Sequence, residues 1–263
     1  MTDRQVESFD GAKLNVKTEG PDGAPAVLLL HCLGGDLGVW DGVVPELAKG
    51  FKVIRYDARG HGRSDAPAGE YSVEMMAKDA LAVLDASGVG KAHVVGLSMG
   101  GMIGMWLAAH AADRVERLVI ANSTAHIPAT EMLNGWIKTA RDGGHQGLAE
   151  PIITGWLSSG FKAANPEKTR ELVDTMRNMT VDGFAGSVAV LRDSDRRPDL
   201  PLIKAPTLII AGIEDGPRGE GAAAAMAENI TGATRANLPD AAHLSPAENP
   251  AAFSSAVLAH LAP

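Results

Sequence analysis

His93-Val94-Val95-Gly96-Leu97-Ser98-Met99-Gly100-Gly101-Met102 is a stretch in which a serine follows a short apolar run and precedes apolar residues at helical spacing. A serine on a sharp turn from strand to helix, a nucleophile elbow, needs residues with almost no side chain two positions before and after it. Gly96 and Gly100 meet this requirement. Ser98 would then lie at a helix N-terminus, where free N–H groups favour a developing negative charge. The alternative is a glycine-flanked turn without chemistry, since G-x-S-x-G also occurs by chance.

Length and charge exclude several classes of protein. The chain has 263 residues, enough for one α/β domain with an insertion or for two small domains, and its formal net charge is −8. This charge argues against a nucleic-acid or anionic-membrane partner, and an anionic small substrate would need local cations. We find neither an apolar run near the roughly 20 residues of a membrane helix nor a secretory signal, and we expect a cytoplasmic protein. Cys32 is the single cysteine, which excludes an intrachain disulfide and a thiolate metal cluster.

The order of apolar patterns predicts a mostly parallel sheet. Residues 5–9 and 13–18 alternate around a turn, as in an antiparallel hairpin at a sheet edge. Buried strands and helices then alternate, which favours right-handed crossovers with helices on both faces of the sheet. The predicted strands are 26–30, 51–56, 93–97, 115–121, 206–211 and 234–238, and the predicted flanking helices include 72–86, 219–229 and 250–261.

Between residues 123 and 200 the pattern is helical, without a convincing strand. Helices inserted between two strands of a parallel sheet would lie over the carboxyl ends of the strands, so we predict a cap at 123–200 on a core of 1–122 and 201–263. Ordinary surface helices are the alternative interpretation.

A serine nucleophile needs a base, and the base needs an orienting acid. In elbow-type hydrolases the acid and then the histidine follow the serine along the chain. Asp215 comes after a buried strand, and His243 lies in a loop after the last strand. We therefore predict Ser98, Asp215 and His243 as a catalytic triad, with Glu214 as the alternative acid.

The oxyanion formed by attack at a carbonyl needs preorganised N–H donors. One comes from the residue after the nucleophile, Met99, and the other from the loop after an early strand, Leu33. A simple strand-to-helix turn is the alternative for the loop at Leu33. The histidines show no metal-ligand spacing such as H-E-x-x-H, and we expect neither a metal nor a cofactor.

With these residues assembled, the chain resembles the α/β-hydrolase superfamily and, within it, the 3-oxoadipate enol-lactonases. The resemblance implies an eight-stranded, mostly parallel sheet with a helical cap after the sixth strand, and it gives Ser98, Asp215 and His243 as the triad. Cys32 and the loop 216–220 depart from the lactonase pattern. The resemblance is carried by 56–62, 96–104, 114–122 and 205–212 in the core and by Trp136 and Leu191-Arg192-Asp193 in the cap.

These residues predict a serine hydrolase, and the resemblance implies that it opens a small enol-lactone bearing a carboxylate. Arg192 is the candidate partner of that carboxylate, with a salt bridge to Asp193 or Asp195 as the alternative. Trp136 lines the pocket wall or packs inside the cap. A carboxylesterase or acyl-homoserine lactonase is a second hypothesis, and a hydrolase-fold binding protein with little turnover is a third. The sequence leaves the oligomeric state open.

Overall fold

The computed structural model describes residues 2–262, without the side chains of residues 2, 3, 217 and 218. Within this part of the chain, eight strands form a single sheet in the order β1-β2-β4-β3-β5-β6-β7-β8. The strands are β1 Thr2–Glu7, β2 Lys13–Glu19, β3 Ala26–Leu30, β4 Lys52–Tyr56, β5 Ala92–Leu97, β6 Val115–Ala121, β7 Thr207–Gly212 and β8 Thr234–Leu238.

The sheet is antiparallel at one edge and parallel elsewhere. β1 pairs with β2 and β2 with β4 in antiparallel register, and every pair from β4 to β8 is parallel. β3, β5 and β7 are buried along their whole length, as continuous apolar runs covered on both faces require. The predicted edge hairpin and mostly parallel sheet are confirmed.

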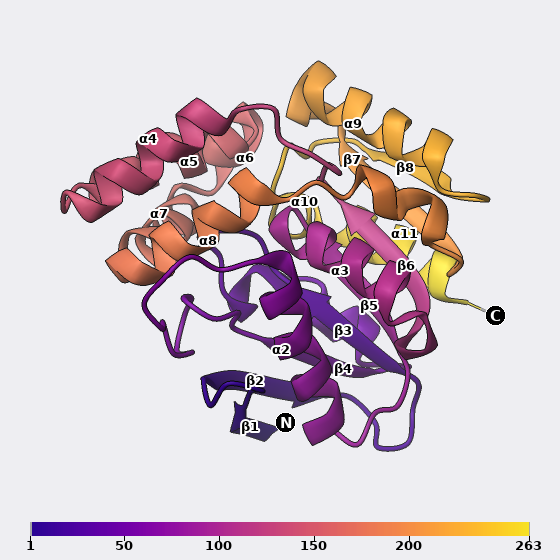
Figure 1. The fold of residues 1–263 in the computed structure, drawn as a ribbon. Helices are drawn as coiled ribbons and strands as arrows, with labels where there is room; N and C mark the ends of the chain where they lie inside the picture. Colours follow the sequence, from indigo (N-terminus) through magenta and orange to yellow (C-terminus); the bar gives the residue numbers. More distant parts are fainter. Residues whose placement is uncertain (1, 263) are drawn as a thin grey trace.

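Helices cover both faces of the sheet (Figure 1). α2 and α3 pack against each other, whereas α1 contacts α11. α2 begins where the Ser72 hydroxyl accepts the Met75 N–H at 3.1 Å, the hydrogen bond expected of an N-cap serine. The α-helices are α1 Val44–Leu47, α2 Val73–Ala86, α3 Met99–His110, α9 Gly216–Asn229, α10 Ser245–Glu248 and α11 Pro250–Leu261, and the short 3₁₀ helices are η1 Leu37–Trp40, η2 Ala112–Arg114, η3 Arg197–Leu202 and η4 Ile213–Asp215.

The chain between β6 and β7 is helical, and we call residues 123–200 the helical segment. Figure 1 shows its helices together at one end of the molecule. Their contact with the core is close at Gly183, where a Cβ atom would lie 2.3 Å from the Gly60 carbonyl oxygen. The helices are α4 Thr130–Arg141, α5 His145–Trp156, α6 Ser159–Ala164, α7 Pro166–Arg177 and α8 Val181–Asp193. α6 is too short to have been predicted from periodicity.

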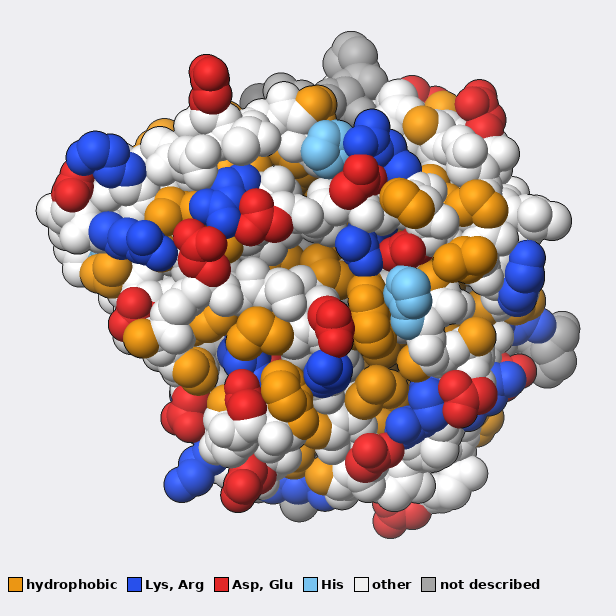
Figure 2. All heavy atoms as spheres, viewed as in Figure 1, with side chains coloured by type: hydrophobic (Ala, Val, Ile, Leu, Met, Phe, Trp, Pro, Cys, Tyr) orange, Lys and Arg blue, Asp and Glu red, His pale blue; other side chains and the backbone are white. Residues whose placement is uncertain are grey.

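Charged side chains of both signs alternate over the face drawn in Figure 2, with hydrophobic side chains between them. Several charged side chains of the protein form ion pairs, such as Arg192 with Glu70 and Lys91 with Glu116, both at 2.8 Å. Among the described residues, no helix combines the length and apolar character needed to cross a membrane.

Candidate active site

Ser98 lies on the turn between β5 and α3, in a backbone conformation that non-glycine residues rarely adopt (φ 55°, ψ −113°). The glycines around it allow this turn. A Cβ at Gly96 would lie 2.2 Å from the Gly100 carbonyl oxygen, and a Cβ at Gly100 would lie 2.1 Å from the Leu30 carbonyl oxygen. The stretch is therefore a strained strand-to-helix turn whose neighbouring backbones approach too closely for any side chain.

The three side chains predicted as a triad lie in one hydrogen-bonded chain. His243 Nε2 is 2.9 Å from Ser98 Oγ, and His243 Nδ1 is 3.0 Å from Asp215 Oδ2. A carboxylate only accepts, so Nδ1 carries the proton and Nε2 is free to accept the serine hydroxyl. The side chains of His243 and Asp215 are 18% and 20% exposed, which leaves the site open to a small molecule. Glu214, the alternative acid, is exposed.

Asn122 connects the acid to the loop that carries His243. Its Nδ2 donates to Asp215 Oδ2 at 3.2 Å and to the Ala242 carbonyl at 2.9 Å. Its Oδ1 accepts the Ser245 hydroxyl at 2.6 Å. The sequence predicted a strand that ends just before Asn122. It could not predict the hydrogen-bond partners of Asn122, because they come from distant segments of the chain.

Two buried residues carry the N–H groups predicted as oxyanion donors. Met99 follows Ser98 at the start of α3, and Leu33 lies in the loop after β3. Both residues are fully buried, and neither N–H donates a hydrogen bond to any described residue. Unpaired buried donors are rare, so both N–H groups stay candidates for the predicted oxyanion hole.

His61 holds the loop that carries Leu33. Its Nε2 accepts the Gly34 N–H at 3.1 Å, and its Nδ1 donates to the Arg59 carbonyl at 3.1 Å. Burial, together with the neighbouring His31, lowers the pKa of His61 to about 3. The ring therefore stays neutral at physiological pH and can keep accepting the Gly34 N–H.

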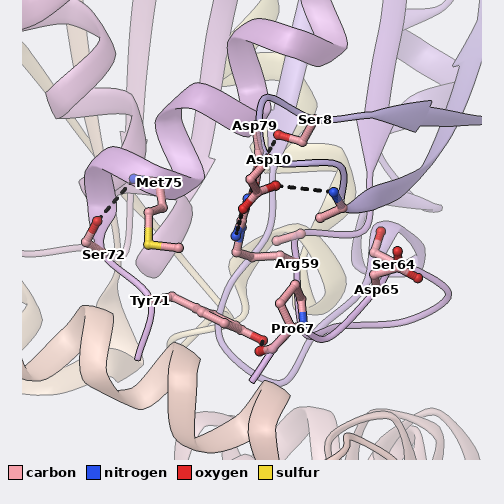
Figure 3. Close-up of polar contacts among 12 residues, drawn as sticks. Ser8, Asp10, Arg59, Ser64, Asp65, Pro67, Tyr71, Ser72, Met75 and Asp79 are labelled. Atoms are coloured by element: carbon pink, nitrogen blue, oxygen red, sulfur yellow. Dashed lines mark hydrogen bonds and ion pairs between the residues drawn. The ribbon is translucent and has the colours of Figure 1, made fainter. Parts of the chain in front are cut away.

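The turn before His61 is anchored by Arg59, whose guanidinium is fully buried (Figure 3). Arg59 Nε and Nη2 donate to Asp79 at 2.6 Å each, and Nη1 donates to Asp10 at 2.9 Å. The rings of Phe9 and Tyr71 lie 5.4 and 5.7 Å from the guanidinium carbon. A buried cation with two carboxylate partners fixes this turn. The turn in its place also fixes the position of His61, which accepts the Gly34 N–H.

A model of the alpha/beta hydrolase fold family matches residues 25–250. The chain belongs to the α/β-hydrolase family. This confirms the resemblance to this family seen in the sequence.

The α/β-hydrolase is similar to enzymes of lactone and ester chemistry. It is 32% identical to 3-oxoadipate enol-lactonase 2 of Acinetobacter baylyi over 93% of this chain and 91% of that one. The crystal structure of the enol-lactonase from Burkholderia xenovorans LB400 matches with a TM-score of 0.94 at 33% identity, over 98% and 99% of the two chains. A structure described as Est816, an N-acyl homoserine lactone degrading enzyme, matches with a TM-score of 0.84 at 30% identity, over 98% and 100%.

Arg192 of this α/β-hydrolase pairs with carboxylates of its own chain. It donates to Asp193 at 2.7 and 2.6 Å and to Glu70 at 2.8 Å. The Asp193 pair is the alternative considered from the sequence, and the Glu70 pair adds a link between the helical segment and the core. Trp136 is partly buried in α4 and packs against the core cluster.

Two further side chains border the α/β-hydrolase site. The Trp156 ring lies 5.1 Å from the His243 ring, centroid to centroid, a contact that helical periodicity alone could not reveal. Cys32 is buried, and burial raises the pKa of its thiol to about 12. A thiol protonated at neutral pH acts as a small apolar filler beside the loop at Leu33. Among residues 2–262, no three His, Cys, Asp or Glu side chains are grouped as metal ligands.

Proposed function

We propose that this α/β-hydrolase opens small carboxylic esters through an acyl-enzyme on Ser98, with Asp215 and His243 completing the triad. The observation that carries the proposal is the 2.9 Å contact between Ser98 Oγ and His243 Nε2. The Leu33 and Met99 N–H groups, which donate to no described residue, are the proposed oxyanion donors. A nucleophile, a base in the correct tautomer and oxyanion donors are the parts that acyl transfer needs.

The chemistry runs in two steps. His243 Nε2 takes the Ser98 proton as Oγ attacks the ester carbonyl, and the N–H groups of Leu33 and Met99 stabilise the oxyanion. The carbon–oxygen bond to the leaving group breaks, and His243 gives its proton to the departing oxygen. Water then attacks the acyl-enzyme and loses a proton to His243. The bond between the acyl carbon and Ser98 Oγ breaks, His243 returns the proton to Oγ, and the acid leaves. Asp215 stabilises the imidazolium formed in each step.

We propose a carboxylate-bearing enol-lactone as the substrate. Support comes from the names of the relatives, two of which are enol-lactonases. Two acidic side chains of the chain already occupy the donors of Arg192, so a substrate carboxylate would have to displace one of them to bind there. An acyl-homoserine lactone is the second candidate, favoured by the likeness to Est816. The helical segment would act as a cap over the site in either case.

Initial rates on a panel of an enol-lactone, a saturated lactone, an acyl-homoserine lactone and short aryl esters test this proposal. We expect the highest kcat/KM on the enol-lactone and loss of all these activities in Ser98→Ala. Equal rates across the panel would contradict the substrate assignment. Undiminished turnover by Ser98→Ala would contradict the mechanism.

A further inference from the structure

The loop that carries His243 has three consecutive N–H groups, and each of them has an acceptor. The Ala242 and Leu244 N–H groups donate to Glu248 Oε1 at 3.1 and 3.0 Å. The His243 N–H donates to the Trp156 carbonyl at 2.9 Å. Hydrogen bonds at three successive N–H groups hold the backbone of this loop in place. These acceptors therefore set the position of the His243 backbone, and only rotation of the side chain remains free.

Glu248 also reaches the helical segment. Its second oxygen, Oε2, accepts the Ser158 N–H at 2.8 Å. The carboxylate thus bonds the segment at Ser158 on one side and the histidine loop on the other. The Trp156 ring also packs beside the imidazole. Residues 156–158 and the loop at 242–244 are therefore joined in two ways. The His243 N–H bonds the Trp156 carbonyl directly, and the Glu248 carboxylate bridges the two segments.

The charge of Glu248 suits this arrangement. A carboxylate accepts several hydrogen bonds at once, and bonds to an ionised acceptor are about twice as strong as neutral ones. Burial raises the pKa of Glu248, while the N–H groups of Ser158, Ala242 and Leu244 oppose the shift. Burial disfavours the charged carboxylate of Glu248, which a glutamate at the exposed surface would avoid. A positioning role therefore explains this residue better than a contribution to solubility.

We propose that Glu248 is a positioning residue that ties the helical segment to the histidine loop and so keeps His243 at hydrogen-bond distance from Ser98. The inference rests on the proposed function, since it takes His243 as the base. It makes residues 156–158 part of the catalytic framework, because they share the anchor of the histidine.

Two variants of Glu248 separate the two connections. Glu248→Ala removes all three hydrogen bonds. Glu248→Gln keeps one carbonyl oxygen, which can serve Ala242 and Leu244, but turns an NH₂ group toward the Ser158 N–H. Glu19→Gln is the matched control, since Glu19 is a partly buried glutamate that pairs with Arg55 at 2.9 Å, in the antiparallel part of the sheet. Unfolding midpoints of all three variants give the loss of stability that each change causes.

The readouts are the rate of Ser98 labelling by a fluorophosphonate and amide hydrogen exchange at residues 158 and 242–244. We expect Glu248→Ala to slow labelling about 100-fold, as a displacement near 1 Å can, and to speed exchange at all these amides. Glu248→Gln should slow labelling less and speed exchange mainly at Ser158. Glu19→Gln should leave both unchanged even if its midpoint falls.

Labelling of Glu248→Ala at the wild-type rate would overturn the proposal, as would equal slowing in Glu19→Gln at matched stability. If the wild-type serine is not labelled at all, the proposed function fails. Amide exchange still decides the role of Glu248 in that case, because unchanged exchange at residues 242–244 in Glu248→Ala would show that it does not hold the loop.

Discussion

The side chain of Asp215 shows how one residue gives a histidine its role. Its Oδ2 lies 3.0 Å from His243 Nδ1 and also accepts from Asn122. This geometry sets the tautomer of the ring and, in the proposed mechanism, would supply a negative charge next to the imidazolium that forms when Ser98 loses its proton. Glu214, one residue earlier, is exposed. This difference in burial between the two neighbouring acids cannot be seen from their positions in the chain.

Replacing each acid in turn tests this distinction. Asp215→Asn should lower kcat on any ester substrate by about 10⁴-fold, because the neutral amide neither favours the correct tautomer nor stabilises the imidazolium. Glu214→Gln is the control and should keep kcat within about twofold of wild type. Steady-state kinetics on an aryl ester measure both. The reverse pattern, with Glu214→Gln inactive, would assign the acid to Glu214.

At the scale of elements, the site depends on the close approach of β3, β5 and α3 at the elbow. Gly100 stands where α3 passes the end of β3, and a Cβ there would lie 2.1 Å from the Leu30 carbonyl oxygen. Overlap with backbone cannot be relieved by a rotamer change, so the turn and the strands would have to separate. The glycine pattern that revealed the elbow in the sequence is thus also a packing requirement.

A pair of glycine substitutions tests this requirement. Gly100→Ala should lower the free energy of unfolding by about 3 kcal/mol or more, because neighbouring backbone must move. Gly135→Ala, at an exposed position in α4 with no atom within 4 Å of the added Cβ, should raise it by about 0.5–1 kcal/mol. Denaturant unfolding gives both values. A Gly100→Ala protein as stable as wild type would contradict the packing argument.

Elements with a long periodic pattern were predictable, and contacts between them were not. The strand at 234–238 and the helix at 250–261 begin and end where the sequence predicted. The elbow was predictable because only glycine, which has no side chain, fits two positions before and after a serine on so tight a turn. Trp156 and Glu248 were missed, since the first reads as one more apolar helical residue and the second as one more surface acid. Their roles arise from the tertiary placement of the helical segment over the histidine loop.

For the whole molecule, buried polar groups hold the core loops and make stability depend on pH. His61 joins the turn anchored by Arg59 to the loop at Leu33, and burial lowers its pKa from 6.5 to about 3. Because the folded pKa lies below that of the unfolded chain, the unfolded chain takes up the proton first as the pH falls. The contribution of His61 to stability is complete above about pH 6.5 and is lost progressively toward pH 3.

This linkage predicts a steep loss of stability in mild acid. Between pH 6 and 4, His61 should contribute a fall of up to about 1.4 kcal/mol per pH unit in the free energy of unfolding. His61→Gln keeps an acceptor for the Gly34 N–H but does not titrate, so its stability curve should be flatter by that amount. Denaturant titrations at several pH values measure both curves. Parallel curves for the two proteins would contradict the assignment to His61.

Ser98, activated by His243, is the nucleophile that we propose for ester hydrolysis. The most direct measurement follows lactone turnover while a fluorophosphonate is added in substoichiometric steps, with adducts counted by intact mass and located by peptide mapping. We expect activity to fall linearly to zero as one adduct per chain forms on Ser98. Activity that persists when Ser98 is fully labelled, or inactivation with the adduct on another residue, would contradict the account.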